Sequence, residues 1–469
     1  MTSNQTLKVQ AHFFWRRALL ILTILALCLG QSFLLAPRVL AQEEETETKA
    51  PRVNLAAQDP ARNRSIAELT PEEKLADYAA FWDIIYDAYP MLGYLRRQGV
   101  DPEALKDQYE QGVLDLATRA DWLAYFQRII TDLTMGGKDV GHLSIVGLGN
   151  HLLNADYQSY CFYLAEYPDD PWLDMMGEVF ENPHVLGFYN LVEEEREPGV
   201  EPHIEIPDNL YTEFHPEADW SYLYINSFLN QNMDDQDILA DFFMETEGQG
   251  IGNVIIDLRD NQGGYNDYWL LNIVAPNIKK PLQVENFGLY KESPWTQACL
   301  DYYASSTYEE DLVELKEAGP LPTLIFSWNR RPDPLPRMPK LVKEDIADLE
   351  EAFQETIRIA PSTDEPLYTG KIWILSGPLS YSASEYFISF AKRTGFAKIV
   401  GEESGGDGSC VVTLYNALPE SGLIIRYNAL YGLNPDGSPN EDQATQPDFP
   451  IAEGQDALDL AIQLISKGE

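Results

Sequence analysis

The chain has 469 residues, a length that suits two or three domains around a sizeable core. Its hydrophobic content of 45%, with many tyrosines, phenylalanines and tryptophans, excludes a disordered protein. The formal net charge of −42 excludes nucleic acid and anionic membrane surfaces as expected partners, because these are themselves negatively charged.

The first residues predict an export segment. Lys8, Arg16 and Arg17 precede the uncharged run 18–36, and small residues up to Ala41 offer a cleavage site. Residues 1–41 are therefore expected to be a signal peptide, with an uncleaved membrane anchor as the alternative, because the run can span a bilayer. Residues 42–64 are expected to be a flexible acidic linker. This predicts a secreted or cell-surface protein.

Residues 65–146 predict a helical module that ends in a glycine-rich loop. Thr70 and Glu73 form a capping-box pattern, and further helices are expected over 101–114 and 120–133. The loop from Met135 leads to His142, and a short strand is expected over 143–146.

The rest of the chain predicts an α/β core. Residues 147–215 read as a mixed connecting region, and residues 216–469 alternate strands with helices. The proline-rich part at about 276–369 is expected to be an insertion or cap over the core, with an amphipathic helix near 344–359.

The stretch 371–394 places serines between a buried strand and a helix. Ser382 lies at the expected helix N-terminus, where backbone amides can stabilise an oxyanion, so it is a candidate nucleophile. The alternative is structural, because Ser382 and Glu385 also have the spacing of a capping box.

A second candidate feature is the Gly263-Gly264 pair, which follows the buried strand 254–259. Two glycines allow backbone amides to approach a ligand closely, as an oxyanion hole requires, or they serve a tight turn. Asp257 and Arg259 are expected to pair with each other or to hydrogen-bond for structural reasons.

Histidine is scarce, and only His142 follows a glycine-rich loop and opens an apolar strand, which makes it the candidate general base. The metal and nucleotide motifs H-E-x-x-H, G-x-x-x-x-G-K-[ST] and G-x-G-x-x-G after a strand are absent from the sequence. Because there is no C-x-x-C pair, a cysteine zinc site is not expected. Two alternatives stay open for Cys161, Cys299 and Cys410: one disulfide among them, or three buried thiols.

Together these motifs resemble the tail-specific (C-terminal processing) serine peptidases and their relatives, the tricorn core protease and the interphotoreceptor retinoid-binding protein repeats. The matching segments, in the family's order, are Gly141-His-Leu-Ser144, Asp257 to Gly264, Ser380 to Glu385, Val400-Gly-Glu402 and Glu441 to Asp448. The resemblance implies a ClpP/crotonase-like β-β-α core with an N-terminal helical module and an inserted cap region.

The resemblance also implies roles for single residues. Ser382 would be the nucleophile, and the amides of Ala383 and of Gly263 or Gly264 would form the oxyanion hole. The processing proteases use a lysine where this chain has Asp407, which excludes a Ser-Lys mechanism. The tricorn-like branch instead implies His142 as base and Glu441 as the carboxylate that orients it.

Two further points concern Ser144 and a PDZ-like domain. Ser144 is a candidate auxiliary hydroxyl, and no separate PDZ-like stretch is evident before Trp220. We therefore expect a secreted or surface-anchored serine endopeptidase that acts on peptides or polypeptides without metal or organic cofactor. The alternative is a non-catalytic protein that binds a lipid, glycan or peptide on the same scaffold.

Overall fold

The computed structural model describes residues 64–168, 171–194, 202, 206–229, 233–305, 324–330 and 337–469. The expected signal peptide or anchor lies outside the described residues, as does the expected linker up to residue 63, and both remain predictions. Across the described ranges, no helix combines the length and the apolar character that a membrane span requires.

The N-terminal module is helical, as predicted. It contains α2 (Pro71–Asp87), α3 (Leu92–Arg97), α4 (Pro102–Tyr109) and α5 (Arg119–Leu133). The Thr70–Glu73 capping box is confirmed, because the Thr70 side chain accepts from the Glu73 amide and the Glu73 carboxylate accepts from the Thr70 amide. Helix α3 was not predicted, because six residues are too few to show a periodic pattern.

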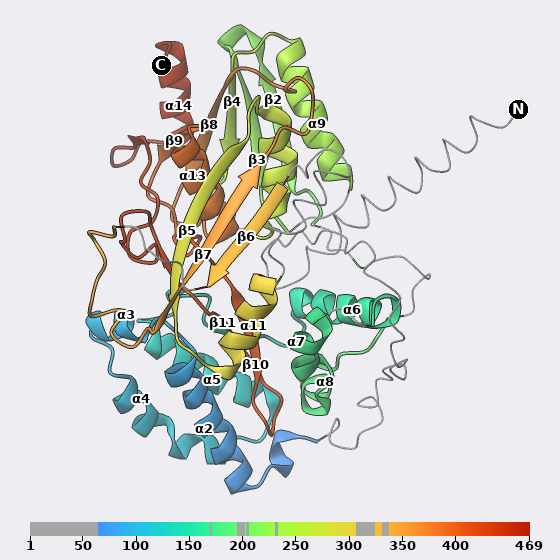
Figure 1. Cartoon of the computed structure of the whole chain (residues 1–469), viewed down its shortest axis with the longest axis vertical. Coiled ribbons are helices and arrows are strands. Elements are labelled where there is room, and N and C mark those ends of the chain that lie inside the picture. Colours follow the sequence, from blue (N-terminus) through green and yellow to red (C-terminus); the bar gives the residue numbers. More distant parts are fainter. Residues whose placement is uncertain are drawn as a thin grey trace, which may run out of the picture.

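The connecting region is mostly helical and then enters the central sheet. It contains α6 (His151–Glu166), α7 (Pro171–Phe180) and α8 (Pro183–Tyr189), followed by strand β2 (Leu210–His215). Strand β2 pairs with β3 (Trp220–Ile225), so the sheet begins before the boundary expected at residue 216. In Figure 1 the helices α6 to α8 lie beside the blue N-terminal module, at the opposite end of the molecule from α9 (Met233–Gly248) and α14 (Ala457–Ser466).

A six-stranded sheet forms the core and confirms the predicted α/β class. Its order is β13-β9-β8-β4-β3-β2, and every neighbouring pair is parallel except β2 with β3. The remaining strands are β4 (Asn253–Asp257), β8 (Lys371–Ser376), β9 (Lys398–Gly401) and β13 (Phe449–Pro450). The parallel crossovers are α9 (Met233–Gly248) between β3 and β4, and α13 (Ala383–Thr394) between β8 and β9.

Both faces of this sheet are covered, which explains its nearly continuous apolar strands. Ile255, Trp373 and Val400 pack in one cluster with α14 (Ala457–Ser466), whereas Val254, Ile374 and Ile399 belong to the main core on the side of α13. Alternate residues of one strand thus serve opposite layers. The turn after β4 continues into α10 (Asn266–Trp269) and the π-helical turn Leu270–Val274.

The predicted insertion at 276–369 supplies most of a second, antiparallel sheet of order β12-β5-β7-β6. Its strands are β5 (Leu282–Tyr290), β6 (Leu324–Arg330), β7 (Glu351–Ile359) and β12 (Tyr431–Leu433), and α11 (Pro294–Ser305) follows β5. Figure 1 shows β5, β7 and β6 as three long neighbouring strands. The helix predicted near 344–359 is wrong, because residues 351–359 alternate in burial and pair with strands on both sides.

This second sheet is attached to the helix that follows the candidate nucleophile. The hydroxyl of Tyr386 in α13 donates to the buried Glu355 carboxylate of β7, and Arg393 Nη1 donates to Asn286 Oδ1 of β5 at 2.6 Å. The position of α13 is therefore supported from the insertion as well as from the core.

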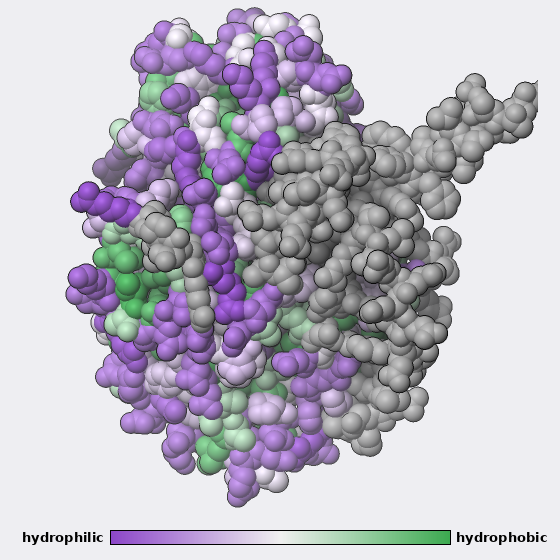
Figure 2. Space-filling view, viewed as in Figure 1, coloured by the Kyte–Doolittle hydropathy of each residue, from purple (hydrophilic) through white to green (hydrophobic). Residues whose placement is uncertain are grey.

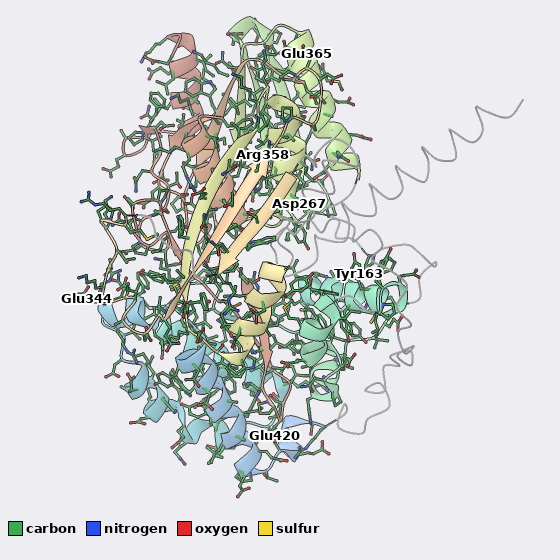
Figure 3. The ribbon with its side chains drawn as sticks, viewed as in Figure 1. Tyr163, Asp267, Glu344, Arg358, Glu365 and Glu420 are labelled. Atoms are coloured by element: carbon green, nitrogen blue, oxygen red, sulfur yellow. The ribbon has the colours of Figure 1, made fainter. Side chains whose placement is uncertain are left out.

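A third sheet joins the helical module to the C-terminal part of the chain. Strand β1 (Ser144–Ile145) pairs with β11 (Ile424–Asn428), which pairs in turn with β10 (Thr413–Ala417). The tip of the β10–β11 hairpin reaches α2, where Asp77 accepts from the amides of Glu420 and Ser421 at 2.8 and 2.9 Å. Figure 3 labels Glu420 beside the N-terminal module, at that end of the molecule.

The described part of the surface shown in Figure 2 is mostly hydrophilic, with small apolar areas between the polar ones. This agrees with the net charge of −42. Cys161, Cys299 and Cys410 are buried thiols, as in the alternative without a disulfide.

Candidate active site

Ser382 lies where β8 turns into α13, at the N-terminus of the helix. It has φ 56° and ψ −122°, a backbone conformation that side-chain-bearing residues rarely adopt. A tertiary contact holds it there, because its amide donates to Gly406 O at 3.2 Å. Its carbonyl accepts the first hydrogen bond of the helix, from the Tyr386 amide at 2.9 Å.

The capping-box interpretation of Ser382 and Glu385 is wrong. The Ser382 side chain accepts no cap hydrogen bond from the helix. The Glu385 carboxylate is fully buried and turns toward the C-terminal loops, where it accepts from Asn440 Nδ2 at 2.9 Å and from Thr445 Oγ1 at 2.8 Å. Tertiary hydrogen bonds have replaced the local pattern that the sequence suggested.

His142 ends the glycine-rich loop of the helical module, as predicted, and strand β1 fixes its C-terminal side. The residue before it, Gly141, is held through its carbonyl, which accepts from the Asn428 amide at 2.7 Å. The Tyr89 hydroxyl donates to Val140 O at 2.8 Å and fixes the other side of the turn. These contacts hold His142 at φ 54° and bury it to 3% exposure.

The structure brings His142 and Ser382 together from positions 240 residues apart in the chain. The imidazole Nε2 lies 3.0 Å from Ser382 Oγ, within hydrogen-bond distance. On the opposite side of the ring, Nδ1 lies 2.5 Å from Asp407 Oδ2. Serine, imidazole and carboxylate are thus connected in line.

The carboxylate on the imidazole is Asp407, whereas Glu441 was expected there. Asp407 belongs to the loop after β9, and this loop is bound to the nucleophile turn through the Gly405 amide, which donates to Ser380 O at 2.8 Å. Glu441 instead contacts the residue before His142, because its Oε2 accepts from the Gly141 amide at 3.2 Å. The expected pairing of Glu441 with the imidazole is therefore corrected to Asp407.

The environment keeps Asp407 ionised. Burial alone would raise its pKa, but attraction to His142 and hydrogen bonds from three side chains outweigh burial and hold the pKa below its ordinary value. Besides the imidazole, the donors are Tyr381 OH at 2.8 Å and Asn428 Nδ2 at 3.2 Å. An ionised carboxylate here favours the tautomer whose Nδ1 carries the proton and whose Nε2 can accept one.

Tyr381 is a residue that the sequence did not single out. It immediately precedes the nucleophile, and its ring lies 5.1 Å from the imidazole, centroid to centroid. Burial and then repulsion from Asp407 raise its pKa well above the ordinary value, so the phenol stays a donor. From the sequence, Asp407 is evident only as the residue that replaces the lysine of the processing proteases, and its position beside the imidazole comes from the structure.

The glycine turn lies against the nucleophile turn. A Cβ atom added to Gly263 would come within 2.8 Å of Tyr381 O and 2.9 Å of Ser382 Cβ, so this position requires glycine. The Gly263 amide already donates to Asn261 Oδ1 at 2.8 Å, which withdraws it from an oxyanion hole. Within the described ranges the Gly264 amide makes no hydrogen bond, and the Ala383 amide, at the first helical position, has no intrahelical acceptor. The structure therefore favours Gly264 over Gly263 as the partner of Ala383.

The other residues considered from the sequence have structural contacts. Ser144 Oγ donates to the His142 carbonyl at 3.3 Å and does not reach the nucleophile through any hydrogen bond in the described part of the chain. Asp257 and Arg259 pair as expected, with Arg259 Nη2 2.6 Å from Asp257 Oδ2. Tyr222 OH also donates to that oxygen, at 2.7 Å.

A serine joined to an imidazole and a buried carboxylate, beside two amides that have no acceptor in the described part of the chain, defines the class of serine hydrolases. Residues 219–451, about half of the chain, match the model of peptidase family S41. The chain belongs to that family and is a serine peptidase. The matched range contains Ser382, Asp407 and both glycines, whereas His142 precedes it.

Solved structures with low sequence identity also match. A proposed peptidase from Parabacteroides merdae is 16% identical, with 85% of this chain and 97% of that chain covered and a TM-score of 0.49. The photosystem II D1 C-terminal processing protease is 12% identical, with 85% and 98% covered and a TM-score of 0.38. The tricorn protease is 14% identical, with 54% and 18% covered and a TM-score of 0.27. No curated protein matches the chain.

Proposed function

We propose that this peptidase hydrolyses peptide bonds through an acyl-enzyme on Ser382, with His142 as general base and Asp407 as the carboxylate that orients it. The observation that carries the proposal is the pair of distances on the imidazole, 3.0 Å from Nε2 to Ser382 Oγ and 2.5 Å from Nδ1 to Asp407 Oδ2. Both fit the roles of base and orienting acid.

The proposed reaction begins when Nε2 takes the Ser382 proton while Oγ attacks the scissile carbonyl carbon. The amides of Ala383 and Gly264 stabilise the oxyanion, and Asp407 stabilises the imidazolium that forms. The imidazolium then returns its proton to the leaving amine as the peptide C–N bond breaks. Water hydrolyses the ester by the same steps in reverse, with His142 again as base, and releases the second product.

The proposed substrates are peptides or polypeptides, as the family implies. We also propose that the protein is exported, since residues 1–41 have the charge and hydropathy pattern of a signal peptide or anchor. Sequencing the N-terminus of the protein recovered from outside the cytoplasm tests this, with Gln42 as the expected first residue if the segment is cleaved. Protein confined to the cytoplasm would contradict export.

The experiment that tests the catalytic proposal is labelling with a fluorophosphonate probe, combined with hydrolysis of a fluorescently quenched casein. We expect the wild type to be labelled and active, and Ser382→Ala to be neither. Ser384→Ala is the matched control, because Ser384 is a buried serine two residues away whose Oγ has no hydrogen-bond partner within the described ranges. A folded wild type that is neither labelled nor active would favour the non-catalytic, ligand-binding alternative.

A further inference from the structure

Glu441 is a buried carboxyl group that the proposed mechanism does not use. Its side chain is 2% exposed. Among the described residues, its Oε2 accepts a single hydrogen bond, from the Gly141 amide, and its Oε1 is buried without a hydrogen-bond partner. A carboxylate normally accepts several hydrogen bonds when it is buried, so this poorly solvated group requires an explanation.

The charges around Glu441 do not favour a carboxylate. The titratable groups that face it come from the helical module, the His142 loop, the nucleophile turn and the Asp407 loop, and they are Tyr89, Tyr94, Lys138, Asp139, Tyr381 and Asp407. His142 follows the glycine that Glu441 contacts. Among these groups, Lys138 is the permanent cation. Its Nζ lies 3.9 Å from Glu441 Oε1, at the outer limit of an ion pair, and its side chain is 47% exposed. Water therefore screens much of its attraction.

Burial and then repulsion from Asp407 raise the pKa of Glu441 well above its ordinary value. Asp407 keeps its negative charge, because it accepts from the imidazole and two further side-chain donors, whereas Glu441 accepts from one amide in the described part of the chain. With two carboxyl groups on either side of one turn, the better solvated one ionises and the other keeps its proton.

We propose that Glu441 is a positioning residue that acts as a neutral carboxyl group and fixes the Gly141–His142 turn through the Gly141 amide. This inference rests on the proposed role of His142 as general base. Both residues of the turn have positive φ, 56° and 54°, and such a turn needs contacts on both of its backbone polar groups. The Gly141 carbonyl accepts from the Asn428 amide, and the Gly141 amide donates to Glu441. Loss of the contact with Glu441 would therefore leave the turn that carries the His142 imidazole fixed on one side only.

Two substitutions test the inference. Glu441→Gln keeps a neutral group of the same size with an acceptor oxygen for the Gly141 amide, and kcat/KM is expected to stay within a few-fold of wild type. Glu441→Ala removes the acceptor, and kcat is expected to fall on the order of a hundredfold with little change in KM, the effect of displacing a catalytic group by about 1 Å. In wild type, kcat/KM is expected to fall at alkaline pH as Glu441 ionises beside Asp407. This alkaline limb is expected to move to higher pH in Glu441→Gln.

The control is Asp156→Asn, because Asp156 is also a fully buried carboxyl group with a raised pKa, about 7, but lies in α6 and accepts from Tyr415 OH. This variant should keep the wild-type alkaline limb. If Glu441→Gln is as impaired as Glu441→Ala in a folded protein, or keeps the wild-type alkaline limb, a neutral Glu441 is refuted while the labelling of Ser382 still supports the peptidase. A wild type without labelling or hydrolysis would overturn both proposals.

Discussion

Replacing Asp407 with asparagine changes one oxygen of a buried carboxylate into an amide nitrogen at nearly constant volume. The carboxylate accepts from His142 Nδ1 at 2.5 Å, from Tyr381 OH at 2.8 Å and from Asn428 Nδ2 at 3.2 Å. An amide has one acceptor atom, so at least one of these donors would face an N–H group. Asn428 cannot turn its own amide around without loss, because its Oδ1 accepts from two backbone amides.

The size of the effect follows from which atom faces the imidazole. If the new amide nitrogen does, it donates to Nδ1, the proton moves to Nε2, and Nε2 can no longer accept from Ser382. If the oxygen does, the tautomer is correct but the imidazolium loses its negative partner. The same exchange in a serine protease triad lowers kcat about 10⁴-fold, which corresponds to roughly 5.5 kcal/mol. We expect a loss of this order in kcat and little change in KM, because Asp407 lies on the opposite side of the imidazole from Ser382 and its carboxylate is occupied by three donors.

The assay is steady-state hydrolysis of quenched casein, together with the rate of fluorophosphonate labelling, which should fall in parallel with kcat. Asp156→Asn provides the control for an asparagine placed at a buried aspartate that also accepts from a tyrosine hydroxyl. Folding of each variant is checked by circular dichroism and thermal unfolding. If Asp407→Asn keeps most of its kcat while Glu441→Gln abolishes it, Glu441 orients the imidazole and the assignment of Asp407 is wrong.

Two further predictions concern a hydrogen bond and a buried acid. Tyr381→Phe removes a hydrogen-bond donor that lowers the pKa of Asp407, so the pKa of Asp407 should rise. The acid limb of kcat/KM should then move to higher pH, and kcat should fall roughly 10- to 100-fold. Tyr415→Phe is the control, and an unchanged acid limb in Tyr381→Phe would contradict the role of Tyr381 as a donor to Asp407. Burial raises the pKa of Asp77 to about 6, so its contribution to stability is present below about pH 4 and is lost as the pH rises through 6. The free energy of urea unfolding of wild type relative to Asp77→Asn should therefore fall by about 2.5 kcal/mol between pH 4 and 7, and parallel pH curves would rule this out.

The sequence predicted the residues of the site that local patterns reveal. Ser382 follows from a strand, a turn and a helix, and His142 from a glycine-rich loop before a strand. The choice between Asp407 and Glu441 could not be made this way, because both belong to irregular loops that meet the same turn. Only the three-dimensional course of those loops decides which carboxyl reaches Nδ1 and which reaches the neighbouring amide.

Two local patterns were misleading for a related reason. The S-x-x-E spacing at Ser382 suggested a capping box, but hydrogen bonds from Asn440 and Thr445 draw Glu385 away. The residues of β7 suggested an amphipathic helix because polar residues interrupt the apolar ones. One of these, Glu355, is buried and accepts a hydrogen bond from Tyr386 of helix α13. In both cases a long-range polar contact, which no sequence period encodes, outweighs the local preference.

Because Asp407 and not Glu441 contacts the imidazole, different loops hold the catalytic residues in place. Ser382, His142 and Asp407 all have positive φ, 56°, 54° and 47°, so each depends on tertiary contacts to stay in place. The Asp407 loop and the nucleophile turn support each other directly, because the Ser382 amide donates to Gly406 O and the Gly405 amide donates to Ser380 O. A carboxylate on this loop is thereby fixed to the nucleophile itself, and the imidazole is held between the two. The loop with Glu441 is then left to support the turn that carries His142, which a neutral carboxyl can do.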